Sequence, residues 1–178
     1  MAQVYHKHTR LPGRDYTQGT FYVTLCSRDR KELFGRITRN GTDAVMDLND
    51  AGRIVDECWQ AIPAHFPHVR LDETQIMPDH LHAILILVPG VSTWSTRWVD
   101  ATTGDAAMMH RPKGPQRGSL GAIIGAFKSV TTKRINATTG RTGSSIWQEG
   151  FHERIVRQYG CEHGRIAQYI AENPANWR

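Results

Sequence analysis

Two histidines separated by one residue are the clearest candidates for chemistry in this sequence. His80 and His82 lie in the segment MPDHLH, residues 77–82, at the start of an apolar run. Because side chains alternate along a strand, both imidazoles would point to one face about 7 Å apart along the backbone, where they can converge on one metal ion. At the start of a buried strand the two imidazoles need a polar or metal partner, because desolvating unpaired imidazoles is costly. Local hydrogen bonds of the two rings are the alternative.

A tyrosine and an amide near the C-terminus are candidates to join the histidines. Tyr169 and Asn173 are four residues apart in a segment with helical spacing, which predicts that both project from one helix face. An amide oxygen is a suitable third ligand for a hard divalent ion, so histidine and amide ligands suit Mg²⁺ or Mn²⁺ better than structural zinc. The alternative is a tyrosine that packs half-buried beside Ile166 and Ile170.

Hydrophobic patterning predicts the elements that must position these residues. Alternating or continuous apolar runs predict four strands, at residues 21–27, 69–77, 81–88 and 151–157. Apolar residues at spacings of three and four predict three helices, at residues 48–62, from 120 to a loop at 138–145, and at 162–173. Asp47 or Asn49 is the N-cap candidate of the first helix and Ser119 that of the second. The run at 81–88 is apolar on both faces, which predicts a central strand.

The predicted order β, α, β, β, α, β, α is typical of an α+β domain. It describes a ferredoxin-like split βαβ antiparallel sheet with two crossover helices on one face and a C-terminal helix that carries Tyr169. The 178 residues suit one domain spanning residues 1–178. Within it we expect residues 1–19 to form a basic arm. Residues 89–118 are rich in Gly, Pro, Ser and Thr, which predicts a mobile insertion.

The charge balance favours a polyanionic partner. Lys and Arg number 22 against 17 Asp and Glu, which gives a net charge of +5. Seven basic residues are candidates for phosphate contacts, with solvated surface charge as the alternative: Arg10, Arg14, Lys128, Lys133, Arg134, Arg154 and Arg157. No apolar run approaches the roughly 20 residues of a membrane span, so we expect a soluble, cytoplasmic protein. The three cysteines are widely spaced, which predicts small core residues and no disulfide framework.

Four segments together carry a resemblance to a known family. They are PDHLH at 78–82, SLGAIIGAFKSVTTKRIN at 119–136, IWQEGFHERIVR at 146–157 and YIAENP at 169–174. In order and spacing they resemble the one-tyrosine HUH transposases, and the nearest branch is the REP-associated tyrosine transposases, which are similar to insertion-sequence transposases. The resemblance extends from about Tyr16 to Pro174.

The resemblance implies a metal-dependent endonuclease and strand transferase that acts on single-stranded DNA at hairpin-forming repeats. By motif, His80 and His82 would bind Mg²⁺ or Mn²⁺, Asn173 would be the third ligand, and Tyr169 would be the nucleophile that forms a 5′-phosphotyrosine. Such an enzyme would serve DNA recombination and transposition at the bacterial nucleoid, without a nucleotide cofactor, as a monomer or a homodimer. The alternative is a catalytically silent module of ferredoxin-like fold that binds single-stranded DNA or RNA hairpins and regulates them.

Overall fold

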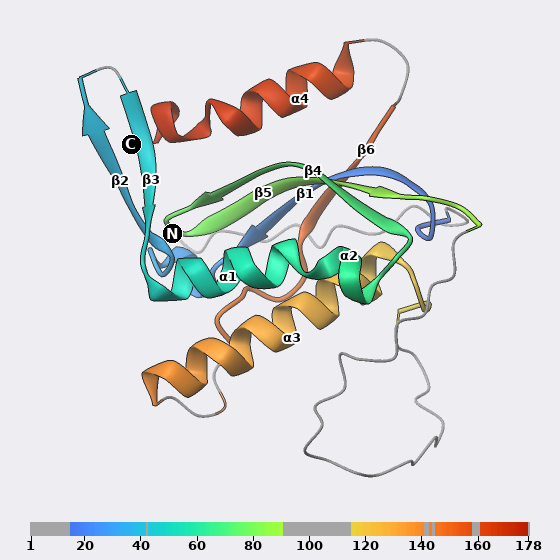
Figure 1. The fold of residues 1–178 in the computed structure, drawn as a ribbon, viewed down its shortest axis with the longest axis horizontal. Coiled ribbons are helices and arrows are strands. Elements are labelled where there is room, and N and C mark those ends of the chain that lie inside the picture. The colour runs from blue at the N-terminus through green and yellow to red at the C-terminus, as the bar shows by residue number, and fades with distance from the viewer. Residues whose placement is uncertain are drawn as a thin grey trace, which may run out of the picture.

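A four-stranded antiparallel sheet forms the centre of the protein (Figure 1). The computed structural model describes residues 15–41, 43–90, 115–140, 143, 145–157 and 161–177. The strands are β1 (Gly19–Cys26), β4 (Val69–Met77), β5 (His80–Leu87) and β6 (His152–Val156), in the order β4-β5-β1-β6. This order, with every neighbouring pair antiparallel, confirms the predicted ferredoxin-like sheet and its central strand β5.

The helices lie on both faces of the sheet. Helices α1 (Asp50–Gln60) and α3 (Leu120–Thr139) cover one face, as expected for the crossover helices, and the short α2 (Ile62–His65) follows α1 (Figure 1). Helix α4 (Glu162–Ala171) covers the opposite face. On the α1 and α3 side, Phe21, Val23 and Leu25 of β1 are buried in the core. The alternate residues of β1 therefore face α4.

Several predicted boundaries differ from the observed ones for local reasons. The first helix begins after its N-cap Asn49, whose side chain accepts a hydrogen bond from the Gly52 N–H. It ends at Gln60, and Pro63 occupies the first turn of α2, where its missing N–H is tolerated. Helix α4 ends at Ala171, so the prediction that Asn173 belongs to this helix is wrong. Asn173 instead begins a 3-10 turn, η2 (Asn173–Asn176), which contains Pro174.

A two-stranded hairpin beside the main sheet has no counterpart in the predicted elements. It consists of β2 (Gly35–Asn40) and β3 (Asp43–Leu48), which pair in antiparallel register. One face of β3 carries Ala44, Met46 and Leu48, but exposed Val45 on its other face and the mostly polar β2 leave only a weak apolar alternation. The hairpin lies beside the C-terminal end of α4 (Figure 1).

The structure tests the prediction for the cysteines, but most of the predicted arm and insertion lies outside the described residues. Cys58 is a buried core residue as predicted, whereas Cys26 is half-buried and Cys161 is exposed. Residues 1–14 of the predicted basic arm and 91–114 of the predicted insertion lie outside the described residues. Among the described residues, none of the helices has the length and apolar character that crossing a bilayer requires.

The turn that precedes β5 is fixed by backbone hydrogen bonds to two other segments. The Phe34 N–H donates to the Pro78 carbonyl over 3.0 Å, and the Ser27 N–H donates to the Asp79 carbonyl over 2.8 Å. The Phe34 carbonyl in turn accepts from the Asn49 N–H, next to the first turn of α1. A Cβ at Gly52 would overlap the Phe34 carbonyl oxygen, so this close approach requires glycine.

We therefore expect opposite effects from two glycine substitutions in helices. Gly52→Ala should lower the free energy of unfolding by about 1–3 kcal/mol, because backbone atoms must move apart. Gly125→Ala, in α3, meets no atom within 4 Å and should raise it by up to about 1 kcal/mol. Urea denaturation of both variants checks this. Equal stabilities of the two variants would contradict the close packing of α1 against Phe34.

Candidate active site

His80 and His82 meet at the start of β5, on the face of the sheet that α4 covers. Their Nε2 atoms are 3.0 Å apart, and only 5% and 6% of the two residues are exposed. Thr24 lies directly opposite His82 and Cys26 directly opposite His80 on β1, and residues opposite one another in antiparallel strands share a face. Both imidazoles therefore lie on one face of the strand, as their spacing predicts, and the two rings are in contact.

Each imidazole has a hydrogen-bond partner at its other nitrogen. His80 Nδ1 lies 2.5 Å from Asp79 Oδ1. His82 Nδ1 lies 2.8 Å from the Tyr22 hydroxyl and 2.9 Å from the Thr24 hydroxyl. Partners of this kind fix ring orientation and leave both Nε2 atoms directed at one point.

Burial keeps both rings neutral. It lowers the pKa of His82 to about 3, with the neighbouring His80 as a further cause. Burial also lowers the pKa of His80, and the Asp79 carboxylate offsets part of this effect. Neutral imidazoles have the lone pair that a metal ligand needs, so the pair is suited to bind a cation near neutral pH.

Tyr169 lies against the histidine pair. Its ring centroid is 5.6 Å from that of His82, in an edge-to-face arrangement, and 52% of the residue is exposed. Ile170, the next residue, is fully buried and anchors α4 on the sheet. Tyr169 thus lies beside the histidine pair within the same chain, half-exposed, and its role as nucleophile stays a prediction.

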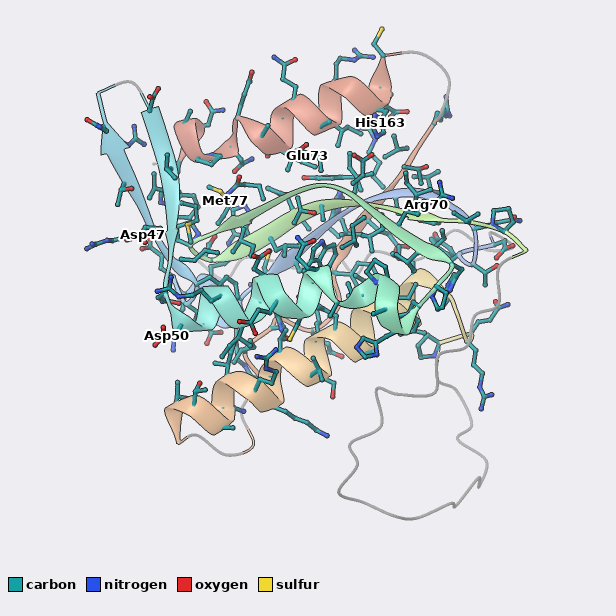
Figure 2. The ribbon with its side chains drawn as sticks, viewed as in Figure 1. Asp47, Asp50, Arg70, Glu73, Met77 and His163 are labelled. Atoms are coloured by element: carbon teal, nitrogen blue, oxygen red, sulfur yellow. The ribbon has the colours of Figure 1, made fainter. Side chains whose placement is uncertain are left out.

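A hydrogen bond near the start of α4 helps to hold the helix over the sheet. His163 Nε2 lies 2.6 Å from Asp72 Oδ2 of β4. In Figure 2, His163 lies between α4 and the sheet.

A second phenol, that of Tyr22, lies deeper in the site. Burial raises the pKa of this phenol, and the nearby Tyr169 is a further cause. The Tyr22 hydroxyl therefore keeps its proton and serves His82 as a hydrogen-bond partner.

The chain beyond α4 also reaches the histidines. Asn173 is buried at the start of η2, and the Trp177 ring centroid lies 5.9 Å from that of His80. The Arg39 guanidinium of the hairpin donates to the Trp177 carbonyl over 2.5 Å. The hairpin thus holds the C-terminal segment beside the site.

The geometry of the two imidazoles fits a divalent cation. Two ligand atoms about 2.1 Å from one ion and at right angles to each other lie about 3.0 Å apart, which is the observed separation of the two Nε2 atoms. The described part of the chain holds no cluster of three or more His, Cys, Asp and Glu residues that could bind a metal. A third ligand would therefore be of another type, and the buried amide of Asn173 is of such a type.

The predicted phosphate contacts are spread over different parts of the molecule. Arg10 and Arg14 lie outside the described residues. Lys133 and Arg134 belong to α3, on the opposite face of the sheet, and Arg134 forms an ion pair with Glu57 of α1.

Lys128 also belongs to α3, whereas Arg154 and Arg157 contact Glu162 of α4. Lys128 is half-buried and donates to the Gln148 and Gly150 carbonyls, and burial lowers its pKa to about 8. Arg154 lies opposite Tyr22 on β6, hence on the face with the histidines, and contacts Glu162 over 2.6 Å. The backbone N–H of Arg157 donates to the same carboxylate.

Sequence reasoning missed several residues around the histidines. Tyr22 and Thr24 occupy the polar positions of an alternating strand, a signal that could have assigned them to the site. Asp79 lies within the motif itself, next to His80. His152 is exposed, and its ring centroid lies 6.5 Å from that of Tyr22. Trp177 carries no sequence signal, because its position depends on the hairpin.

No family model matches the chain. An uncharacterized protein from Haemophilus influenzae is 32% identical in an alignment 184 positions long, which covers 99% of this chain and 92% of that protein. A solved structure described as a REP-associated tyrosine transposase bound to a REP hairpin aligns with a TM-score of 0.56 at 17% identity, over 94% of this chain and 74% of that one. The chain therefore belongs to the family of the Haemophilus influenzae protein, and its fold is that of the REP-associated tyrosine transposases.

Proposed function

We propose that this protein is a metal-dependent endonuclease and strand transferase for single-stranded DNA, with Tyr169 as its nucleophile. The proposal rests on the convergence of Tyr169 with His80 and His82 around one point, on a transposase-like fold. An exposed phenol beside two neutral, buried imidazoles is an arrangement that a merely structural tyrosine does not need.

The proposed reaction exchanges one phosphate ester for another. The Tyr169 oxygen loses its proton to solvent and forms a bond to the phosphorus, while the bond from phosphorus to the 3′-oxygen breaks. The products are a 5′-phosphotyrosine and a 3′-hydroxyl, which takes up a proton. Because the ester is conserved, a 3′-hydroxyl can reverse the step and join DNA without a nucleotide cofactor.

The chain's own groups bind and orient the reacting partners. His80 and His82 would hold Mg²⁺ or Mn²⁺ through their Nε2 atoms, with Asn173 as the proposed third ligand. When bound, such a cation supplies Lewis-acid stabilisation of charge on a phosphate oxygen. The anchored helix α4 supplies the phenol from the opposite side of the site, which limits the loss of entropy on attack.

We propose DNA with hairpin-forming repeats as the substrate. The similar solved structure is described as bound to a REP hairpin, and the net charge of +5 suits a polyanion. Among the described basic candidates, Arg154 and Arg157 contact Glu162 of α4, so we assign them the proposed phosphate contacts. Lys133 and Arg134, on the far face, are excluded from this set.

The nucleophile can be tested with a labelled hairpin oligonucleotide and Mn²⁺ on a denaturing gel. We expect a covalent protein–DNA adduct with the unaltered protein and none with Tyr169→Phe, which lacks the attacking oxygen. Tyr16→Phe is the matched control, because Tyr16 stacks on Phe21 outside the site, and it should form the adduct normally. Adduct formation by Tyr169→Phe would assign the reaction to another residue.

The metal ligands can be tested in the same assay. His82→Ala should reduce the adduct yield by more than about 100-fold, since loss of a ligand should cost at least as much as loss of its supporting groups. His65→Ala, in α2, should leave the yield unchanged. EDTA should abolish the adduct and added Mn²⁺ should restore it. Undiminished activity in EDTA would contradict the role of a metal.

Arg154 and Lys133 should differ in their effect on DNA binding. Arg154→Ala should weaken binding and reduce the slope of log K against log salt by about one, as loss of one phosphate contact does. Lys133→Ala, which removes the same charge from the far face, should change neither quantity. Fluorescence anisotropy over a salt series measures both, and equal effects of the two variants would contradict the proposed face.

A further inference from the structure

The turn after β1 has an unfavourable backbone conformation close to the histidines. Two consecutive residues other than glycine, Asp29 and Arg30, have φ values of 58° and 55°. These residues lie in η1 (Arg28–Arg30), between β1 and the hairpin. Left-handed backbone is disfavoured for residues with a Cβ, so two such residues in succession persist only where other contacts hold them.

Hydrogen bonds fix this turn to the segment that carries His80. The Ser27 N–H donates to the Asp79 carbonyl over 2.8 Å, and the Arg28 N–H donates to the Ile146 carbonyl over 2.7 Å. The Ser27 hydroxyl donates to the Lys31 carbonyl over 2.7 Å and closes the turn. The strained residues are thus set in position relative to the site.

The result of this geometry is a guanidinium placed on a buried carboxylate. Arg30 Nε lies 2.9 Å from Asp79 Oδ2, and its Nη1 donates to the Cys26 sulfur over 2.9 Å. The Asp79 side chain is 6% exposed and that of Arg30 is 44% exposed. The other carboxylate oxygen, Oδ1, lies 2.5 Å from His80 Nδ1. Asp79 therefore divides its two oxygens between Arg30 and His80.

The chemistry of these groups determines which nitrogen of His80 carries the proton. An ionised carboxylate only accepts hydrogen bonds, so His80 must donate from Nδ1, which leaves Nε2 with its lone pair. His82 differs, because the hydroxyls of Tyr22 and Thr24 can either donate to its Nδ1 or accept from it. The position of the ring proton is therefore fixed in His80, whereas in His82 the proton can lie on either nitrogen.

We propose that Asp79, oriented by Arg30, is the positioning residue that presets His80 Nε2 to bind the divalent cation. This inference rests on the proposed function, because it concerns the same cation. Arg30 is required as well as Asp79, since a guanidinium only donates and thereby directs one carboxylate oxygen away from His80. The strained turn after β1 then has a role, because it places the Arg30 guanidinium against the Asp79 carboxylate.

The substitution Asp79→Asn gives a sharp test. Its amide oxygen should accept from Arg30, because Arg30 can only donate, and its NH₂ group should then donate to His80 Nδ1. His80 would carry its proton on Nε2 and lose the ability to bind the cation. In the double variant Arg30→Ala with Asp79→Asn, the amide is free to turn its oxygen to His80, which should restore part of the binding.

Two measurements on the full chain follow these changes. Mn²⁺ titration calorimetry should show about 10- to 100-fold weaker binding for Asp79→Asn, a typical effect for a group that supports a ligand, and tighter binding for the double variant than for Asp79→Asn alone. Long-range ¹H–¹⁵N spectra of the histidine rings without metal should show the His80 proton on Nδ1 in the unaltered protein and on Nε2 in Asp79→Asn. A purely structural role of Asp79 predicts no recovery in the double variant.

Control variants separate the outcomes. Arg36→Ala removes an exposed arginine from the hairpin and should leave Mn²⁺ affinity unchanged, while His80→Ala should abolish binding. If His80→Ala loses binding but Asp79→Asn keeps both the affinity and the Nδ1 proton, the inference is wrong and the proposed function stands. If the unaltered protein binds Mn²⁺ no more tightly than His80→Ala, both are wrong. If Asp79→Asn fails to fold, Arg30→Ala provides the test instead, because Arg30 is half-exposed. Unchanged Mn²⁺ affinity in that variant would contradict the inference.

Discussion

The contact between two buried imidazole nitrogens is the constraint around which the site is built. Two lone pairs 3.0 Å apart, in a place with little water, repel each other unless a proton or a cation lies between them. In the bare chain one ring must therefore donate to the other. The carboxylate of Asp79 and the hydroxyl groups on β1 provide partners for the remaining nitrogens, so the pair can be buried without leaving a polar atom unsatisfied.

The two faces of the sheet have different tasks. One face packs apolar side chains against α1 and α3 and supplies the stability of the domain. The other face presents polar groups from β1, β5 and β6 and is covered by α4, with Trp177 against His80. Tight packing on the first face gives the second a rigid platform, which is what a reacting site needs for its groups to remain aligned. The cost of burying polar groups is thus confined to one small area.

Much of this arrangement follows from local patterns in the sequence. Residue alternation predicts the four strands of the main sheet, and the spacing of His80 and His82 predicts that they share a face. The contact of Tyr169 with that pair depends on how α4 crosses the sheet, which the family resemblance implied and periodicity alone did not. The hairpin, the end of α4 at Ala171 and the contact of Trp177 with His80 are not predictable in this way, because they depend on contacts between segments distant in the sequence. The same holds for Arg30, whose position depends on two left-handed residues.

The attachment of the C-terminal segment to the hairpin has a practical consequence for handling the protein. Because Trp177 lies on His80 and its carbonyl is held by Arg39, any peptide fused after residue 178 would start one residue away from an indole that touches the site. A polyhistidine purification tag at that end would bring a second set of imidazoles close to the first and compete for added manganese. Calorimetry samples should therefore carry such a tag elsewhere or have it removed by a protease.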